Sequence, residues 1–164
     1  MKIKTTILLS LVVLLLVSCA PKEIQKADNF SFVFEEYSCG YLPLLNALDT
    51  STGVLIHTPL GETESIEIPL VLSENEMAMI YQKIISTNYF DYPPEVRVRG
   101  ETPPSTFRLK VINGNFTHDV KWTSDLENAE PNFEESDQLF DLYIFIQQII
   151  HSHPEYPEPK AGCA

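Results

Sequence analysis

The sequence predicts an α+β fold, in which an antiparallel sheet of about five strands carries two amphipathic helices on one face. Several segments alternate apolar and other residues with the period of two that is typical of a half-buried strand. Two longer segments repeat apolar residues at helical spacing, and 164 residues suffice for about one domain. We therefore expect a single α+β domain over residues 30–153.

The first part of this domain is expected to be rich in strands. Phenylalanine occupies alternate positions in residues 30–37, as on the buried side of a strand. Residues 54–58 and 64–71 predict two further strands, and Pro69 places the second of them at an edge or a bulge. The Asp-Thr-Ser-Thr-Gly segment before residue 54 has the chemistry of a hairpin turn.

A helix is predicted to begin at Ser73, because Ser73 and Glu76 have the spacing of a capping box. The apolar residues of its buried stripe are Met77, Ile80, Tyr81, Ile84 and Ile85. We expect this helix to end near Asn88, since a diproline follows at residues 93–94.

A hairpin is predicted next, because residues 106–112 and 115–122 flank Asn113-Gly114, the sequence of a type I′ turn. This turn would place Val111 opposite Phe116, Leu109 opposite His118, Phe107 opposite Val120, and Arg108 opposite Asp119. A second amphipathic helix is expected at residues 136–152, followed by a proline-rich tail at residues 154–164.

The N-terminus has the three parts of an export signal. Lys2 and Lys4 precede an apolar run over residues 5–17, and small residues surround a cysteine directly after it. A run of roughly 13 residues covers about 20 Å as a helix, which is short of the ~30 Å hydrocarbon core. We therefore expect residues 1–18 to be removed as a signal peptide.

The segment Leu16-Val17-Ser18-Cys19 resembles the lipobox of bacterial lipoproteins. In that family the cysteine thiol receives a diacylglyceryl group, a dedicated peptidase cuts before the cysteine, and the new N-terminus can then be acylated. The resemblance implies that Cys19 carries fatty chains such as palmitate, and that the protein faces outside the cytoplasm in the cell envelope. The membrane would be the outer membrane of a Gram-negative host or the cell membrane of a Gram-positive one. The alternative is an ordinary secretory signal with a cysteine by chance.

A second resemblance concerns the domain itself. Leu72-Ser73-Glu74-Asn75-Glu76, followed by a segment containing Tyr-Pro, is similar to small uncharacterised bacterial lipoproteins with a strand-rich N-terminal half. This resemblance implies no activity.

The chain is strongly acidic, with 11 Lys and Arg residues against 23 Asp and Glu and a formal net charge of −12. Such a balance argues against nucleic acid as a partner, because binding to a phosphate backbone requires clustered cations. Removal of Lys2 and Lys4 with the signal peptide leaves nine basic and 23 acidic residues. We expect this acidic domain to stand off an anionic membrane on a tether formed by residues 19–29.

The two remaining cysteines, Cys39 and Cys163, form an even pair in an oxidising compartment and are a candidate disulfide. The bridge would close a loop of about 125 residues and contribute roughly 4 to 5 kcal/mol in the loop-entropy model. The alternative is that Cys39 is a small buried apolar residue and Cys163 an incidental thiol.

The sequence offers one candidate catalytic site and one candidate metal site. A hydrolase would use His118 or His57 with a carboxylate such as Asp119 or Asp49. No Gly-x-Ser-x-Gly, His-Glu-x-x-His or phosphate-binding glycine motif is present in the sequence, which lowers the expectation of an enzyme.

A divalent-cation site would use His151 and His153 with Glu155, joined by His118 or His57. Histidines at the end of a helix are explained more simply by the helix dipole, and the acidic residues 125–137 lack the spacing of a calcium loop. We expect neither a metal nor another cofactor.

Aromatic residues in or beside the expected loops are a further candidate site, as anchors for a protein partner. They are Tyr37, Tyr41, Tyr89, Phe90 and Tyr92. The alternative for the last three is that they seal the end of the first helix. Together the observations favour a lipid-anchored envelope protein that acts as a non-enzymatic binding module, with the membrane and an envelope protein or other ligand as partners.

Overall fold

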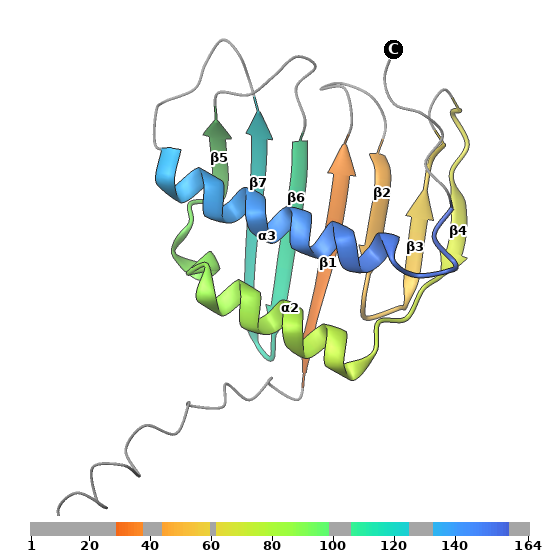
Figure 1. The fold of residues 1–164 in the computed structure, drawn as a ribbon, viewed down its shortest axis with the longest axis horizontal. Coiled ribbons are helices and arrows are strands. Elements are labelled where there is room, and N and C mark those ends of the chain that lie inside the picture. The colour runs from red at the N-terminus through yellow and green to blue at the C-terminus, as the bar shows by residue number, and fades with distance from the viewer. Residues whose placement is uncertain (1–28, 38–43, 60–61, 99–105, 125–132, 158–164) are drawn as a thin grey trace, which may run out of the picture.

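The computed structural model describes residues 29–37, 44–59, 62–98, 106–124 and 133–157. They form an α+β fold with one mixed sheet of seven strands in the order β4-β3-β2-β1-β6-β7-β5 (Figure 1). The strands are β1 (Phe30–Tyr37), β2 (Leu44–Asp49), β3 (Val54–His57), β4 (Ile66–Pro69), β5 (Glu95–Val98), β6 (Thr106–Asn113) and β7 (Phe116–Ser124). The helices are α2 (Glu74–Ser86), the short 3-10 helix η2 (Tyr89–Asp91) and α3 (Phe133–His151).

The predicted α+β class is confirmed, but the expected sheet of about five antiparallel strands matches only roughly. Two strands, β2 and β5, extend the predicted set, and β5 pairs with β7 in parallel. β2 breaks the expected alternation because its polar Asn46 lies on the buried side, where it is 7% exposed. β5 has only four residues, and its partner β7 lies far along the chain.

The hairpin between β6 and β7 forms, but its predicted register is wrong by two residues. The turn is made by Gly114 and Asn115, so that Asn113 pairs with Phe116. Gly114 has φ of 61° at the first turn position, which is the placement that a type II′ turn requires. Pairs such as Leu109 with Val120 therefore replace the expected ones, although every side chain keeps its predicted face.

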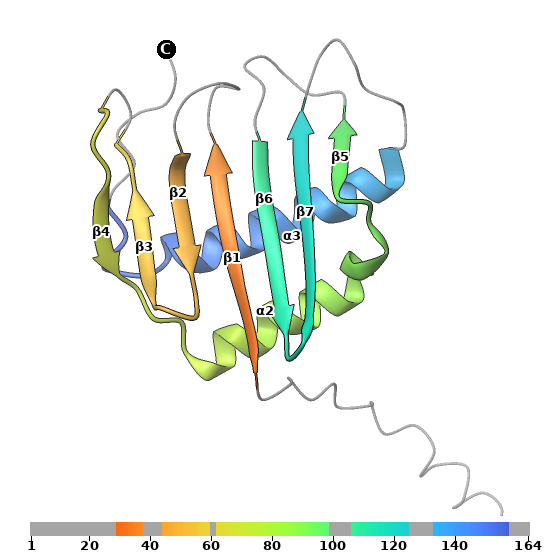
Figure 2. The same cartoon turned by 180° about the vertical axis from the view of Figure 1, so that it is seen from behind.

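Both long helices lie on the same face of the sheet, as the two views show (Figures 1 and 2). α2 begins as predicted, with Ser73 as N-cap and both hydrogen bonds of the capping box formed with Glu76. α3 begins three residues before the predicted start at residue 136. The core between the helices and the sheet includes Phe32, Leu48, Ile80, Val111 and Ile146, each fully buried.

No helix within the described ranges is long and apolar enough to cross a membrane.

Candidate functional site

The opposite face of the sheet is the first candidate site, because none of the described elements covers it (Figure 2). Side chains of a strand alternate between two faces, so the residues between the buried ones point to this side. On β6 these residues include Arg108 and Lys110, on β7 Asp119 and Lys121, and on β5 Glu95 and Arg97. Glu35 of β1 lies directly opposite Arg108 in the register.

Basic residues gather on this face. Four of the five Lys and Arg residues in the described ranges lie here, on the adjacent strands β6, β7 and β5. We call them the basic patch, defined as Arg97, Arg108, Lys110 and Lys121. Three carboxylates, those of Glu35, Glu95 and Asp119, lie among them. The remaining described cation, Lys83, is on α2, on the other side of the sheet.

The rest of the described charge is acidic. Eleven of the 14 Asp and Glu residues whose side chains are described lie outside the basic patch and its three carboxylates. They are Glu36, Asp49, Glu62, Glu64, Glu67, Glu74, Glu76, Asp91, Asp137, Asp141 and Glu155. Most of this negative charge lies away from the basic patch, although the register places Asp49 of β2 and Glu67 of β4 on the same uncovered face.

Ion pairs hold the two arginines of the patch. The Arg108 guanidinium donates to Asp119 at 2.8 Å from Nε, and its Nη1 lies 3.6 Å from Glu35. The hydrogen bond to Asp119 raises the pKa of Arg108 above its ordinary value. Arg97 pairs with Glu95 at 2.9 Å. The predicted position of Asp119 directly opposite Arg108 is therefore wrong, because Lys121 lies there, but the two side chains still meet as a diagonal ion pair.

The two lysines of the patch are placed differently. Lys121 lies directly opposite Arg108, so two like charges face each other across neighbouring strands. Such a pair destabilises a sheet slightly. Lys110 lies opposite Asp119, whose carboxylate is already held by Arg108. Neither lysine has an ion pair with another described residue, and their ammonium groups are available to an external anion.

A second group of polar side chains lies between the sheet and the C-terminal half of α3. Glu36 accepts hydrogen bonds from the side chains of Asn46 at 2.9 Å and of Gln147 at 3.1 Å. The Asn46 side-chain oxygen lies 2.8 Å from Nδ1 of His57. The ring of Tyr156 stacks on that of His151, with centroids 4.0 Å apart. This network joins β1, β2, β3 and α3 around one carboxylate.

The environment of this network shifts several pKa values. Burial lowers the pKa of His57, the charge of Glu36 opposes that shift, and His151 adds to it. Burial also lowers the pKa of His151, again opposed by Glu36. Burial and the charge of Glu36 raise the pKa of Tyr156 to about 12. Burial thus disfavours the charged form of both imidazoles.

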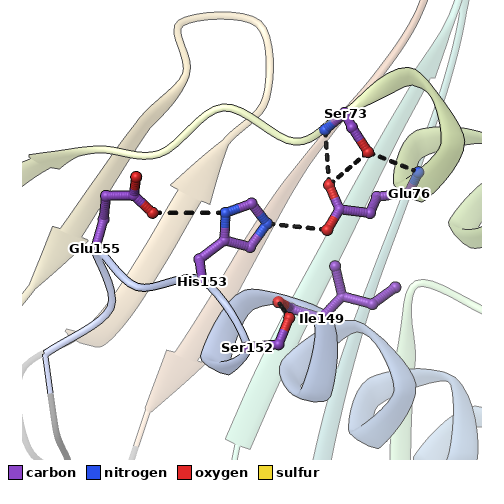
Figure 3. Close-up of polar contacts among 6 residues, drawn as sticks. All are labelled: Ser73, Glu76, Ile149, Ser152, His153 and Glu155. Atoms are coloured by element: carbon purple, nitrogen blue, oxygen red, sulfur yellow. Dashed lines mark hydrogen bonds and ion pairs between the residues drawn. The ribbon is translucent and has the colours of Figure 1, made fainter.

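A third polar cluster ties the two helices together (Figure 3). One oxygen of Glu76 accepts from the backbone N–H and the hydroxyl of Ser73, each at 2.7 Å, and the other lies 3.1 Å from Nε2 of His153. Nδ1 of His153 lies 3.7 Å from Glu155. Burial alone would raise the pKa of Glu76, but the bonds from Ser73 and the charge of His153 outweigh it and lower that pKa. Glu76 therefore caps α2 and holds the end of α3 at the same time.

The residue pairs expected for a hydrolase do not come together. His57 lies on the helix side of the sheet with Asn46, while the Asp49 side chain accepts from Ser51 in the turn at 2.8 Å. The expected turn at Asp49 is thereby confirmed, with Gly53 at φ 67°. His118 and Asp119 are adjacent in β7 and therefore point to opposite faces.

His118 lies at the rim of the core. Its ring is edge-on to that of Tyr89, with centroids 5.2 Å apart, and it also contacts Phe90 and Phe116. Nε2 of His118 is buried and has no hydrogen-bond partner among the described residues.

The histidines expected for a cation site also diverge. His151 stacks on Tyr156, whereas His153 is held between Glu76 and Glu155. Within the described part of the chain, no three His, Cys, Asp or Glu residues are placed to hold a metal ion. Three of the six acidic residues in the segment 125–137, namely Asp125, Glu127 and Glu130, lie outside the described residues.

The aromatic residues beside the first helix mainly serve the core. Tyr89 is fully buried and its hydroxyl donates to the carbonyl of Leu109, while Tyr92 is 9% exposed. Burial raises the pKa of Tyr89 far above its ordinary value. A cavity of about 160 Å³ lies beside them and includes Asn88, Asp91 and Gln138 in its lining. The second interpretation, that these rings seal the end of α2, is the one that the structure supports.

Three candidate residues, Cys19, Cys39 and Cys163, lie outside the described residues, as do Tyr41 and the expected signal peptide and tether. Their expected lipidation and disulfide remain predictions. Sequence reasoning missed Glu36, Asn46 and Gln147, because these polar residues are far apart in the sequence and share no motif.

The sequence matches no protein-family model, and it matches no curated protein at a significant level.

Proposed function

We propose that the protein is a lipid-anchored lipoprotein of the bacterial cell envelope, held by acyl chains on Cys19, whose domain acts as a non-enzymatic binding module. The lipobox resemblance of Leu16–Cys19 supports the anchor. The observation that carries the binding role is the uncovered sheet face with its basic patch. A sheet face that the fold does not use for its own core is a surface available to a partner.

The alternative roles are less well supported by the geometry. His57 and Asp119 are hydrogen-bonded to other residues, and His118 and Asp119 point to opposite faces of the sheet, whereas general acid–base chemistry needs both groups within hydrogen-bond reach of one substrate. The imidazole of His153 is taken by two carboxylates that fix the helices. These side chains serve the fold, which leaves the uncovered face as the site for binding.

The anchor is tested by growing cells that express the protein with labelled palmitate. The label is expected in the wild-type protein, and it is expected to be lost in Cys19→Ala. Cys39→Ala and Cys163→Ala are the matched controls, since each removes a thiol that the lipobox does not contain. Equal labelling of Cys19→Ala and the wild type would contradict the proposal.

A further inference from the structure

The basic patch has a feature that the overall charge of the protein conceals. Its four cations lie among three carboxylates, so the uncovered surface from β1 to β5 has a small positive charge, whereas Asp49 and Glu67 make the β2 to β4 end of the same face acidic. The acidic residues of the helices lie behind the sheet, about one layer or ~10 Å away. Since the Debye length is about 8 Å at physiological ionic strength, an anion in front of the patch is partly screened from those charges.

We propose that the basic patch binds the anionic headgroups of the membrane that holds the anchor, so that the part of the uncovered sheet face formed by β6, β7 and β5 lies toward the lipid and α2 and α3 face away. This inference rests on the proposed function and names the partner of the same site. It also revises the expectation that a net negative charge holds the whole domain off the membrane, because charge segregation orients the domain instead.

The tether places the patch within reach of the membrane. Residues 19–29 span at most about 40 Å when fully extended, at up to ~3.6 Å per residue. They lead into β1, and β1 is the strand that borders β6 in the sheet. A tether of this length would keep the headgroup layer at a high effective concentration near the patch.

The lysines of the patch favour an anion of this kind. Lys121 faces the like charge of Arg108, and a phosphate between the two would replace that repulsion by attraction. Lys110 and Lys121 lie on neighbouring strands and have no ion pair with another described residue. The cations of the patch are spread over three strands. Such a surface can contact several headgroups of a membrane at once, whereas one small ligand would reach only some of the cations.

The test uses the mature lipidated protein, extracted from cells and reconstituted into vesicles of phosphatidylcholine with or without phosphatidylglycerol. Flotation with the vesicles first establishes the anchor. An amine-reactive reagent then modifies the lysines, and mass spectrometry gives the rate at each site. We expect Lys110 and Lys121 to react about fivefold more slowly on the anionic vesicles, as one favourable contact per lysine implies. Lys83 on α2 is the internal control and should react equally on both.

Salt and substitution sharpen the result. About 1 M salt shortens the Debye length to ~3 Å and should restore the fast reaction of both lysines. In Lys110→Gln/Lys121→Gln, modification of Arg97 by a dicarbonyl reagent should be as fast on anionic as on neutral vesicles. In Lys83→Gln, Arg97 should stay protected on the anionic vesicles.

Several outcomes would overturn the inference. Equal lysine rates on both vesicles would remove the lipid contact, and equal protection on neutral vesicles would remove its anionic character. Protection that persists in detergent without lipid would show that a second copy covers the face. Protection found only in native envelopes would indicate an envelope protein or polymer instead. Failure to float would instead contradict the anchor, and hence the proposed function.

Discussion

Alternate residues of the same strands form the two faces of the sheet, one packed against the helices and the other uncovered. In β1, Phe32 points to the helices and is 0% exposed, whereas its neighbour Val33 lies on the uncovered side and is half-buried. In β6, Leu109 enters the core, whereas Arg108 is 44% exposed in its ion pairs. The difference teaches that stability and surface charge are set here by separate residues, so each can be changed without the other.

The largest difference in stability between the two faces is expected when two neighbouring residues of β1 are each replaced by alanine. Phe32→Ala removes a fully buried ring from the centre of the core and should lower the free energy of unfolding by about 3 to 5 kcal/mol. Val33→Ala should lower it by less than about 1 kcal/mol, because that side chain has no layer packed over it. Urea denaturation checks both variants, and similar losses would mean that the second face is also covered.

A smaller effect is expected where the helices are joined on the covered side. Glu76→Gln weakens both the cap at Ser73 and the contact with His153, and should cost about 1 to 2 kcal/mol at pH 7. Glu74→Gln is the control, since Glu74 lies in the same first turn outside the capping box, and it should cost a few tenths of a kcal/mol.

The same residue predicts a dependence on pH. The pKa of Glu76 is lower in the folded protein than its ordinary value of 4.5, so its stabilisation is fully present above pH 4.5. That stabilisation is lost as the pH falls through the folded pKa. The wild type and Glu76→Gln should therefore converge in stability at acidic pH. A constant difference between them down to low pH would contradict this role of the carboxylate.

The smallest effects are expected on the uncovered face. Arg108→Gln should cost about 0.5 kcal/mol in the free energy of unfolding, and less at high salt, because exposed ion pairs contribute little. Lys121→Gln removes the like charge opposite Arg108 and should be neutral or slightly stabilising. Thermal unfolding at two salt concentrations measures both. A loss of several kcal/mol in either variant would place these residues in the core of the fold.

Much of the covered side could be predicted from the sequence, because it depends on periodicity and local signals. The alternation of Phe30, Phe32 and Phe34 predicts β1, and the spacing of Ser73 and Glu76 predicts the start of α2. β2 was missed because Asn46, a polar residue, occupies a buried position where Glu36 and His57 satisfy it. Such compensation is tertiary and leaves no local pattern.

The candidate binding face was only partly visible in the sequence. The pairing of Arg108 with Asp119 was predicted, since the hairpin signal brings β6 and β7 together. The complete basic patch also depends on β5, which precedes the hairpin in the sequence. Its parallel pairing with β7 places Arg97 beside Thr123. The turn lies one residue later than predicted, which shifts the pairing of the two strands by two residues and places Lys121 opposite Arg108. No local rule for Asn-Gly turns would indicate this shift.

The central claim is that alternate residues of one strand serve the fold and the membrane contact, and an alanine scan of β6 tests it most directly. For each variant of the mature lipidated protein, the free energy of unfolding is measured in detergent, and the protection of Lys121 is measured on anionic vesicles. We predict that alanine at Phe107, Leu109 or Val111 lowers the free energy of unfolding by about 2 to 5 kcal/mol. Alanine at Arg108 or Lys110 should instead reduce the protection of Lys121 and leave the free energy of unfolding nearly unchanged. Losses of both quantities at the same positions would contradict the account.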